Sequence, residues 1–131
     1  MRPLAAGRHT MSRSRVYTDR QAAERLAAEL PRWTVETGRL YRRYASDGWR
    51  ASMLIANGIA HLAEVAWHHP DLHIGWDGVT VRLRTHVPDA ITDKDFELAG
   101  MIEHWVCWRP QQGAALEGAP RDGQWRYLAE D

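Results

Sequence analysis

A single cysteine, Cys107, stands among the 131 residues of the chain. It excludes an internal disulfide and a zinc site built from several cysteines. No run approaches the roughly 20 apolar residues that a membrane-spanning helix needs. An excess of one charge is also lacking, since 17 Lys and Arg residues balance 17 Asp and Glu residues, and nothing favours a nucleic acid or an anionic membrane as a partner. We therefore expect a cytoplasmic, single-domain globular protein.

The first 16 residues differ from the rest, because they hold four arginines and no acidic residue. Such a composition is found in organelle transit peptides, but this segment is short and has little helical periodicity. We expect a disordered tail over residues 1–16, with Met11 as an alternative start to Met1. A domain over 17–108 and a C-terminal extension over 109–131, rich in Gly, Pro and Gln, complete the expected organisation.

Three helical patterns and four strand patterns make up the central domain. Thr18 and Gln21 form a capping box before a helix that Pro31 ends. A second helix follows Gly48 and ends by His69, because a residue that precedes proline is pushed out of the helical region. A third helix begins with the capping box of Thr92 and Asp95.

Alternation of apolar and polar residues predicts the strands. They are expected over residues 33–36, 40–45, 72–76 and 79–85, with a short further strand over 125–128. The order is α-β-β-α-β-β-α. It is typical of an α+β domain in which helices pack on one face of a four-stranded antiparallel sheet.

The Asp77-Gly78 pair between two strands favours a two-residue type I′ turn. Such a turn fixes the register, so Trp76 is predicted to pair with Val79, and paired residue numbers sum to 155. The same ladder places His69 opposite His86, where side chains lie roughly 4.5–5.5 Å apart. His68 follows the preceding helix and lies beside them. The sequence thus predicts three histidines at the open end of one hairpin.

Histidine exchanges protons near neutral pH, because its unperturbed pKa is about 6.5. Three converging imidazoles therefore favour acid–base catalysis. A zinc or iron site is the alternative, but the chain has no HExxH motif, no cysteine pair and no carboxylate at a recognisable ligand spacing. A solvated turn is the plain reading of any one of these histidines, whereas the trio together favours a site. We assign no role to His61, His73 or His104.

A wider motif around these histidines resembles the pterin-4a-carbinolamine dehydratases. The matching positions are Glu64, His68, His69, Pro70, Trp76, Val79, Leu83, Thr85, His86, Ile91, Thr92, Asp95, Leu98 and Ala99, together with Trp33 near the first strand. The resemblance runs from about Thr18 to Trp105. Its specific part is the His-His-Pro, Thr-His and Asp pattern with the family's spacing between the histidines.

The resemblance implies an enzyme that dehydrates 4a-hydroxytetrahydropterin to quinonoid dihydropterin, recycling the cofactor of aromatic amino acid hydroxylases. It implies no metal and no bound cofactor, and assembly into a homodimer or homotetramer. His68, His69 and His86 would be catalytic. The substrate-binding residues would be Glu64, Pro70, Thr85, Val87 and Asp95. Asp95 is equally explained as an acid at the start of a helix.

Several positions depart from the family's pattern. Trp67 and Val87 stand where polar residues are common, Asp89-Ala90 replaces a small residue and glycine, and the chain continues beyond Trp108. These departures leave open a non-catalytic, protein-binding relative. The family resemblance supplies two examples of that role, a RuBisCO assembly factor and a dimerisation partner of a transcription factor.

Overall fold

The computed structural model describes residues 14–121 and 123–129. Its helices are α2 (Asp19–Glu29), α3 (Trp49–Ala66) and α4 (Asp93–Cys107), with a short 3₁₀ helix η1 (Gly123–Trp125). Its strands are β1 (Val16–Tyr17), β2 (Thr34–Glu36), β3 (Arg39–Ala45), β4 (Asp71–Gly75), β5 (Gly78–Leu83) and β6 (Ile91–Thr92). The predicted α+β order of the central domain is confirmed.

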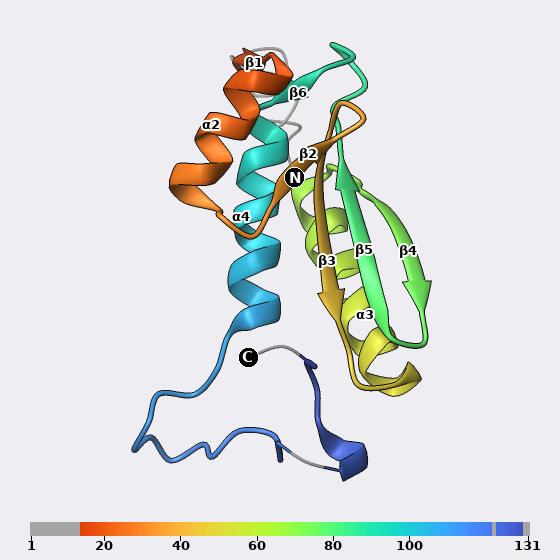
Figure 1. Cartoon of the computed structure of the whole chain (residues 1–131), viewed down its shortest axis with the longest axis vertical. Helices are drawn as coiled ribbons and strands as arrows, with labels where there is room; N and C mark the ends of the chain where they lie inside the picture. The colour runs from red at the N-terminus through yellow and green to blue at the C-terminus, as the bar shows by residue number, and fades with distance from the viewer. Residues whose placement is uncertain (1–13, 122, 130–131) are drawn as a thin grey trace, which may run out of the picture.

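The main sheet has the strand order β2-β3-β5-β4, and every neighbouring pair is antiparallel. One face is apolar and buried, because alternate residues of β3 and β5 point to the same side; it includes Leu40, Tyr44, Val79, Val81 and Leu83. Helix α3 lies behind this sheet, and α4 and α2 lie beside β2 and β3 (Figure 1). The other face of β3, β5 and β4 carries no helix (Figure 1).

Both predicted capping boxes are present. The hydroxyl of Thr18 accepts from the backbone N–H of Gln21, whose side chain accepts from the N–H of Thr18. Thr92 and Asp95 make the corresponding box at α4. Each box satisfies backbone donors that would otherwise lack partners at the start of a helix. Local sequence therefore fixes where these two helices begin.

The predicted register of the β4–β5 hairpin is wrong by two residues. Gly75 pairs with Gly78 and His73 with Thr80, so paired numbers sum to 153 and the turn residues are Trp76 and Asp77. Neither Asp77 nor Gly78 has the positive φ that a type I′ turn requires. A Cβ at Gly78 would lie 2.8 Å from the carbonyl oxygen of Tyr44. Glycine is needed there for close approach to β3, and the prediction mistook it for a turn residue.

A shift of two residues keeps every side chain on its predicted face, because the side-chain period of a strand is two. The ladder extended with the observed register brings His69 level with Arg84 and not with His86. His69 and His86 nevertheless remain on the same, helix-free face of the sheet. The prediction that they share one side of the hairpin survives, whereas the predicted direct opposition is lost.

The two ends of the chain also differ from expectation. Most of the tail predicted over 1–16 lies outside the described residues, but Val16 pairs with Thr92 in a small sheet of β1 and β6 that was not predicted. The strand expected over 125–128 is wrong. Its first residue belongs to η1, and only Leu128 makes an antiparallel bridge, to Ser46. No helix of the described chain is long and apolar enough to cross a membrane.

A charged network lies inside the domain, between β3 and α4. The Glu103 carboxylate accepts from the indole N–H of Trp33 (2.9 Å), from Nε of Arg42 (3.0 Å) and from the Tyr44 hydroxyl (2.7 Å). Burial on its own raises the pKa of Glu103, yet these hydrogen bonds and the charge of Arg42 lower that pKa to about 2. The network therefore ties the sheet to the helix that carries Asp95.

Candidate functional site

The candidate site lies next to the C-terminal ends of α3 and β5. The backbone of Trp67 is left-handed, with φ 54°, and it ends α3 directly before the histidine pair. The N–H of His68 still bonds to the carbonyl of Ala63 at 3.1 Å. This helix end turns the chain sharply, so the two adjacent histidines enter different surroundings.

His68 points into the domain and meets the first turn of α4. Its Nε2 lies 2.6 Å from Oδ1 of Asp95, and the two side chains are 14% and 0% exposed. The carboxylate's other oxygen accepts from the Thr85 hydroxyl and the Thr92 N–H, each at 2.9 Å. For the Asp95 carboxylate to accept this bond, Nε2 of His68 must be the donor, and Nδ1 is then the other ring nitrogen.

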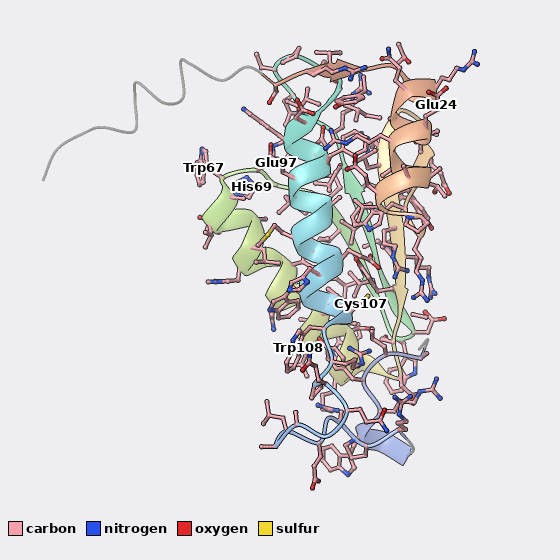
Figure 2. The ribbon with its side chains drawn as sticks, turned by 90° about the vertical axis from the view of Figure 1, so that its left-hand side faces the viewer. Glu24, Trp67, His69, Glu97, Cys107 and Trp108 are labelled. Carbon is pink, nitrogen blue, oxygen red and sulfur yellow. The ribbon has the colours of Figure 1, made fainter. Side chains whose placement is uncertain are left out.

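His69 points the other way and lies at the surface. Its Nε2 is 2.9 Å from Oε1 of Glu64, one turn back in α3, and both side chains are more than half exposed. The ring of Trp67 meets the His69 ring edge-on, with centroids 5.1 Å apart. Figure 2 shows these two side chains together at the end of α3. The carboxylate of Glu64 fixes the His69 tautomer in the same way as Asp95 fixes that of His68.

A cavity of about 240 Å³ brings His69 and His86 together. Its other lining residues are Thr37, Arg39, Asp71, Arg82, Arg84 and Asp89. His86 is exposed and makes no hydrogen bond or ion pair with another described residue. The volume is slightly below the roughly 300–1,000 Å³ of sites for drug-sized ligands, which suits a molecule of about two fused rings.

The predicted trio is thus divided between a buried pair and an open cavity. Thr85 and Asp95 belong to the buried side with His68, and neither lines the cavity. Glu64 reaches the cavity only through His69, whereas Pro70 is half-buried between the histidine pair and β4. Val87 is 87% exposed beside His86. These positions make Asp95 and Glu64 residues that hold histidines in place.

Sequence reasoning missed the charged wall of the cavity. Arg39, Arg82 and Arg84 alternate with buried residues, so the strand pattern already places them on the helix-free face. Asp89 was noted only as a departure from a family pattern, yet its carboxylate bonds to Nε of Arg84 at 2.8 Å. That bond, together with the charge of Arg84, lowers the pKa of Asp89.

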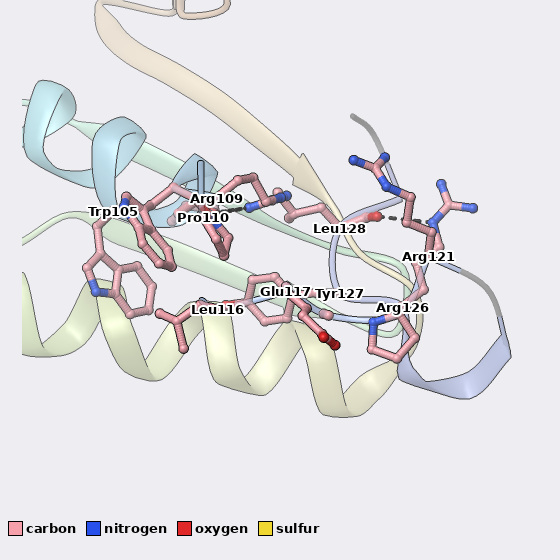
Figure 3. A pocket seen from close by; sticks show the side chains of 14 residues that line it. Trp105, Arg109, Pro110, Leu116, Glu117, Arg121, Arg126, Tyr127 and Leu128 are labelled. Carbon is pink, nitrogen blue, oxygen red and sulfur yellow. Dashed lines mark hydrogen bonds between the residues drawn. The ribbon is translucent and has the colours of Figure 1, made fainter. Parts of the chain in front are cut away.

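A larger cavity of about 600 Å³ lies at the far end of α4. The C-terminal extension closes it with residues 116–121 and 126–128 over Trp105 and Trp108 (Figure 3). Gly58 lets the Trp105 ring pack against α3, since a Cβ there would meet that ring at 1.8 Å. Among the described residues that line this cavity there is no histidine or cysteine.

The smaller cavity is lined by two histidines, whose imidazoles can exchange protons near neutral pH. Across the described ranges, no three His, Cys, Asp or Glu side chains cluster in a way that could hold a metal ion. His68 and His69 are each bonded to one carboxylate, as in sites where an acid orients a histidine, whereas His86 has no such partner among the described residues. Such an arrangement donates and accepts protons at a bound small molecule.

Comparisons with known proteins agree with the motif. Residues 15–105 match the family model described as pterin 4 alpha carbinolamine dehydratase. A protein of Aquifex aeolicus named "Putative pterin-4-alpha-carbinolamine dehydratase" is 33% identical over 86 residues, which cover 66% of this chain and 87% of that protein.

Comparison with solved structures found two matches. The transcriptional coactivator/pterin dehydratase of Brucella melitensis has a TM-score of 0.60 and 24% identity, covering 68% of this chain and 96% of that one. A pterin dehydratase-like protein identified as a RuBisCO assembly factor has a TM-score of 0.45 and 18% identity, covering 55% and 83%. The first likeness concerns the fold alone, and neither carries an activity over to this chain. On the family match over residues 15–105, the chain belongs to the pterin 4 alpha carbinolamine dehydratase family.

Proposed function

We propose that the protein dehydrates 4a-hydroxytetrahydropterin to quinonoid dihydropterin by histidine acid–base catalysis. The observation that carries this proposal is the cavity that His69 and His86 line together. In the reaction, the bond between C4a and the hydroxyl oxygen breaks, the hydroxyl leaves as water after receiving one proton, and N5 gives up one proton. One proton is taken up and one is released, so the enzyme needs a proton donor near the 4a hydroxyl and a proton acceptor near N5.

His69 suits the donor role. The Glu64 carboxylate lies 2.9 Å from its Nε2 and orients the ring, which leaves Nδ1 as the nitrogen available to the substrate. Its Nδ1–H would then protonate the departing 4a hydroxyl. His86, which bonds to no other described residue, suits the role of acceptor for the N5 proton. After the reaction, His69 regains a proton from solvent water and His86 releases one to it.

His68 acts in this proposal as the third imidazole, held from behind by Asp95. Its ring is largely buried and its Nε2 is committed to the carboxylate. His68 does not line the cavity, so we assign it to holding the end of α3 behind His69 and not to direct contact with the pterin. Asp95 keeps that ring oriented and is a positioning residue.

The biological role we propose is recycling of the pterin cofactor of an aromatic amino acid hydroxylase, by a homodimer or homotetramer in the cytoplasm. The test is a direct dehydration assay. Purified protein is added to freshly generated 4a-hydroxytetrahydropterin, and the rate of quinonoid dihydropterin formation is compared with the spontaneous rate. A protein that leaves the spontaneous rate unchanged contradicts the proposal.

A protein-binding role is the second candidate, and the C-terminal extension favours it. Residues beyond the family match build the 600 Å³ cavity over Trp105 and Trp108, and both indoles are about half exposed. Under this proposal, deletion of residues 109–131 leaves dehydration intact but removes binding of a partner protein such as RuBisCO or a hydroxylase. Loss of dehydration by the deletion variant, despite retained fold, argues against separate roles.

A further inference from the structure

The helix-free face of the sheet carries three arginines into the candidate cavity. Arg82, Arg84 and His86 alternate along the end of β5 and its continuation, and Arg39 comes from β3. All four side chains line the same 240 Å³ space. The cavity wall therefore carries three guanidinium groups beside the carboxylates of Asp71 and Asp89.

Two of these arginines are balanced by acids in the same wall. Nη1 of Arg39 lies 3.3 Å from Oδ2 of Asp71, and Nε of Arg84 lies 2.8 Å from Oδ1 of Asp89. Arg84 also donates to the carbonyls of Gly38 and Asp89. These ion pairs hold the guanidinium groups of Arg39 and Arg84 in place and compensate their positive charge.

Arg82 differs, because no carboxylate of the described chain lies within ion-pair distance of its guanidinium. The guanidinium carbon of Arg82 instead lies over the ring of Tyr41, 5.1 Å from its centroid. An aromatic face steadies a cation without occupying its N–H donors. Asp71 lies opposite Arg82 on β4, but its carboxylate bonds to Arg39, so Arg82 presents a positioned charge with free donors to the cavity.

The separation of Arg82 from His86 along β5 indicates which part of a bound ligand the Arg82 side chain would meet. Arg82 precedes His86 by four residues, about 13 Å at the rise of an extended strand. A two-ring molecule whose reacting atoms lie at His69 and His86 leaves its ring substituent free to extend along β5. A long arginine side chain then meets the end of that substituent.

We infer that the cavity takes a pterin whose ring substituent carries an anionic group, a carboxylate or a phosphate, and that Arg82 binds this group. This inference rests on the proposed function and narrows its substrate class. Arg82 is a specificity residue in it and takes no part in proton transfer. A guanidinium matches both anions, since its N–H donors form a planar fork.

The test uses three oxidised, fluorescent pterins with different substituents at position 6: carboxylate, phosphooxymethyl and neutral hydroxymethyl. Fluorescence titrations at low salt compare the parent protein with Arg82→Gln and Arg43→Gln. Arg43 lies on the same sheet face but outside the cavity, where it pairs with Asp77 at 3.1 Å. It is therefore a matched control for loss of one surface charge.

We expect the parent protein to bind at least one anionic pterin more tightly than the neutral one. Arg82→Gln is expected to weaken that binding by about tenfold, as for a charge-assisted hydrogen bond at a partly exposed site. Binding of hydroxymethylpterin, and all binding by Arg43→Gln, are expected to stay within about twofold. Added salt reduces the preference in the parent, because it screens exposed charges. The tighter of the two anionic ligands identifies the group.

Equal binding of all three pterins, unchanged in Arg82→Gln, overturns the inference while leaving the proposed dehydration intact. An equal loss in Arg82→Gln and Arg43→Gln also overturns it, because the effect then comes from overall charge. Failure of every pterin to bind contradicts both the inference and the proposed function. The dehydration assay on the parent protein separates these cases.

Discussion

His68 and Asp95 are joined across the domain by a contact of 2.6 Å between Nε2 and Oδ1. They come from the end of α3 and the start of α4, 27 residues apart. The carboxylate is fully buried, and every hydrogen bond it accepts comes from His68, Thr85 or Thr92. One acid therefore both caps a helix and fixes a histidine tautomer.

Asp95→Asn tests this double role. An amide nitrogen facing Nε2–H removes the acceptor, so we expect dehydration to slow by about 10- to 100-fold and its pH–rate profile to shift. The matched control is Asp93→Asn on the same first turn. Asp93 bonds to the N–H of Arg15, the hydroxyl of Tyr17 and the guanidinium of Arg25.

The control should lose stability and keep activity. Hydrogen bonds to charged groups contribute about 1.5–3 kcal/mol, so Asp93→Asn is expected to unfold at lower urea with an unchanged pH–rate profile. Equal effects of the two variants on the profile would show that Asp95 acts only as a helix cap.

His86→Ala tests the proton transfer itself. A positioned acid or base contributes about 10²–10⁴-fold in rate, and we expect a loss of that size with normal folding, because His86 is exposed. His73→Ala is the control, since His73 is exposed on the same sheet face but does not line the cavity. It should be nearly silent. Full dehydration activity in both variants is incompatible with catalysis by His86.

Stability at low pH should depend on Glu103. Its folded-state pKa of about 2 lies below the ordinary value of 4.5. The carboxylate therefore contributes stability that is fully present above about pH 5 and is lost as the pH falls toward 2, up to roughly 3 kcal/mol. Urea unfolding measured between pH 7 and pH 2.5 follows this loss.

Two variants isolate the contribution of Glu103. Glu103→Gln should be less stable at pH 7 by about 2–4 kcal/mol, because Arg42 is 4% exposed and keeps its charge. Its stability should also fall less between pH 5 and pH 2.5. Glu97→Gln, an exposed change on the same helix, should follow the parent curve. A parent and Glu103→Gln with parallel pH curves would place the acid sensitivity elsewhere.

Much of the fold follows from local sequence. Both capping boxes and the alternation in β3 and β5 lie in short windows, so their prediction needed no tertiary information. The register of β4–β5 did need it. Gly78 is glycine because the Tyr44 carbonyl of a neighbouring strand approaches within 2.8 Å of its Cβ position, and no window around the hairpin contains that strand.

The candidate site was likewise predictable only where local sequence determines it. Strand parity placed His69 and His86 on one face, and the wrong register did not change that. The division of His68 from His69 was not predictable, because it depends on the left-handed backbone of Trp67. Left-handed conformations are uncommon for bulky residues, and the sequence offers no glycine or asparagine there to signal one.

Trp67 leads to the last prediction, on stability. A left-handed backbone costs a residue with a bulky side chain roughly 1–2 kcal/mol, and the Trp67 side chain, 70% exposed, regains little by burial. Asparagine tolerates this conformation, so Trp67→Asn should raise the free energy of unfolding by about 0.5–1 kcal/mol in urea titrations. Trp76→Asn is the control, since Trp76 is also 70% exposed but has no positive φ. An equal gain in both variants would trace the effect to loss of a surface indole and not to the backbone that separates His68 from His69.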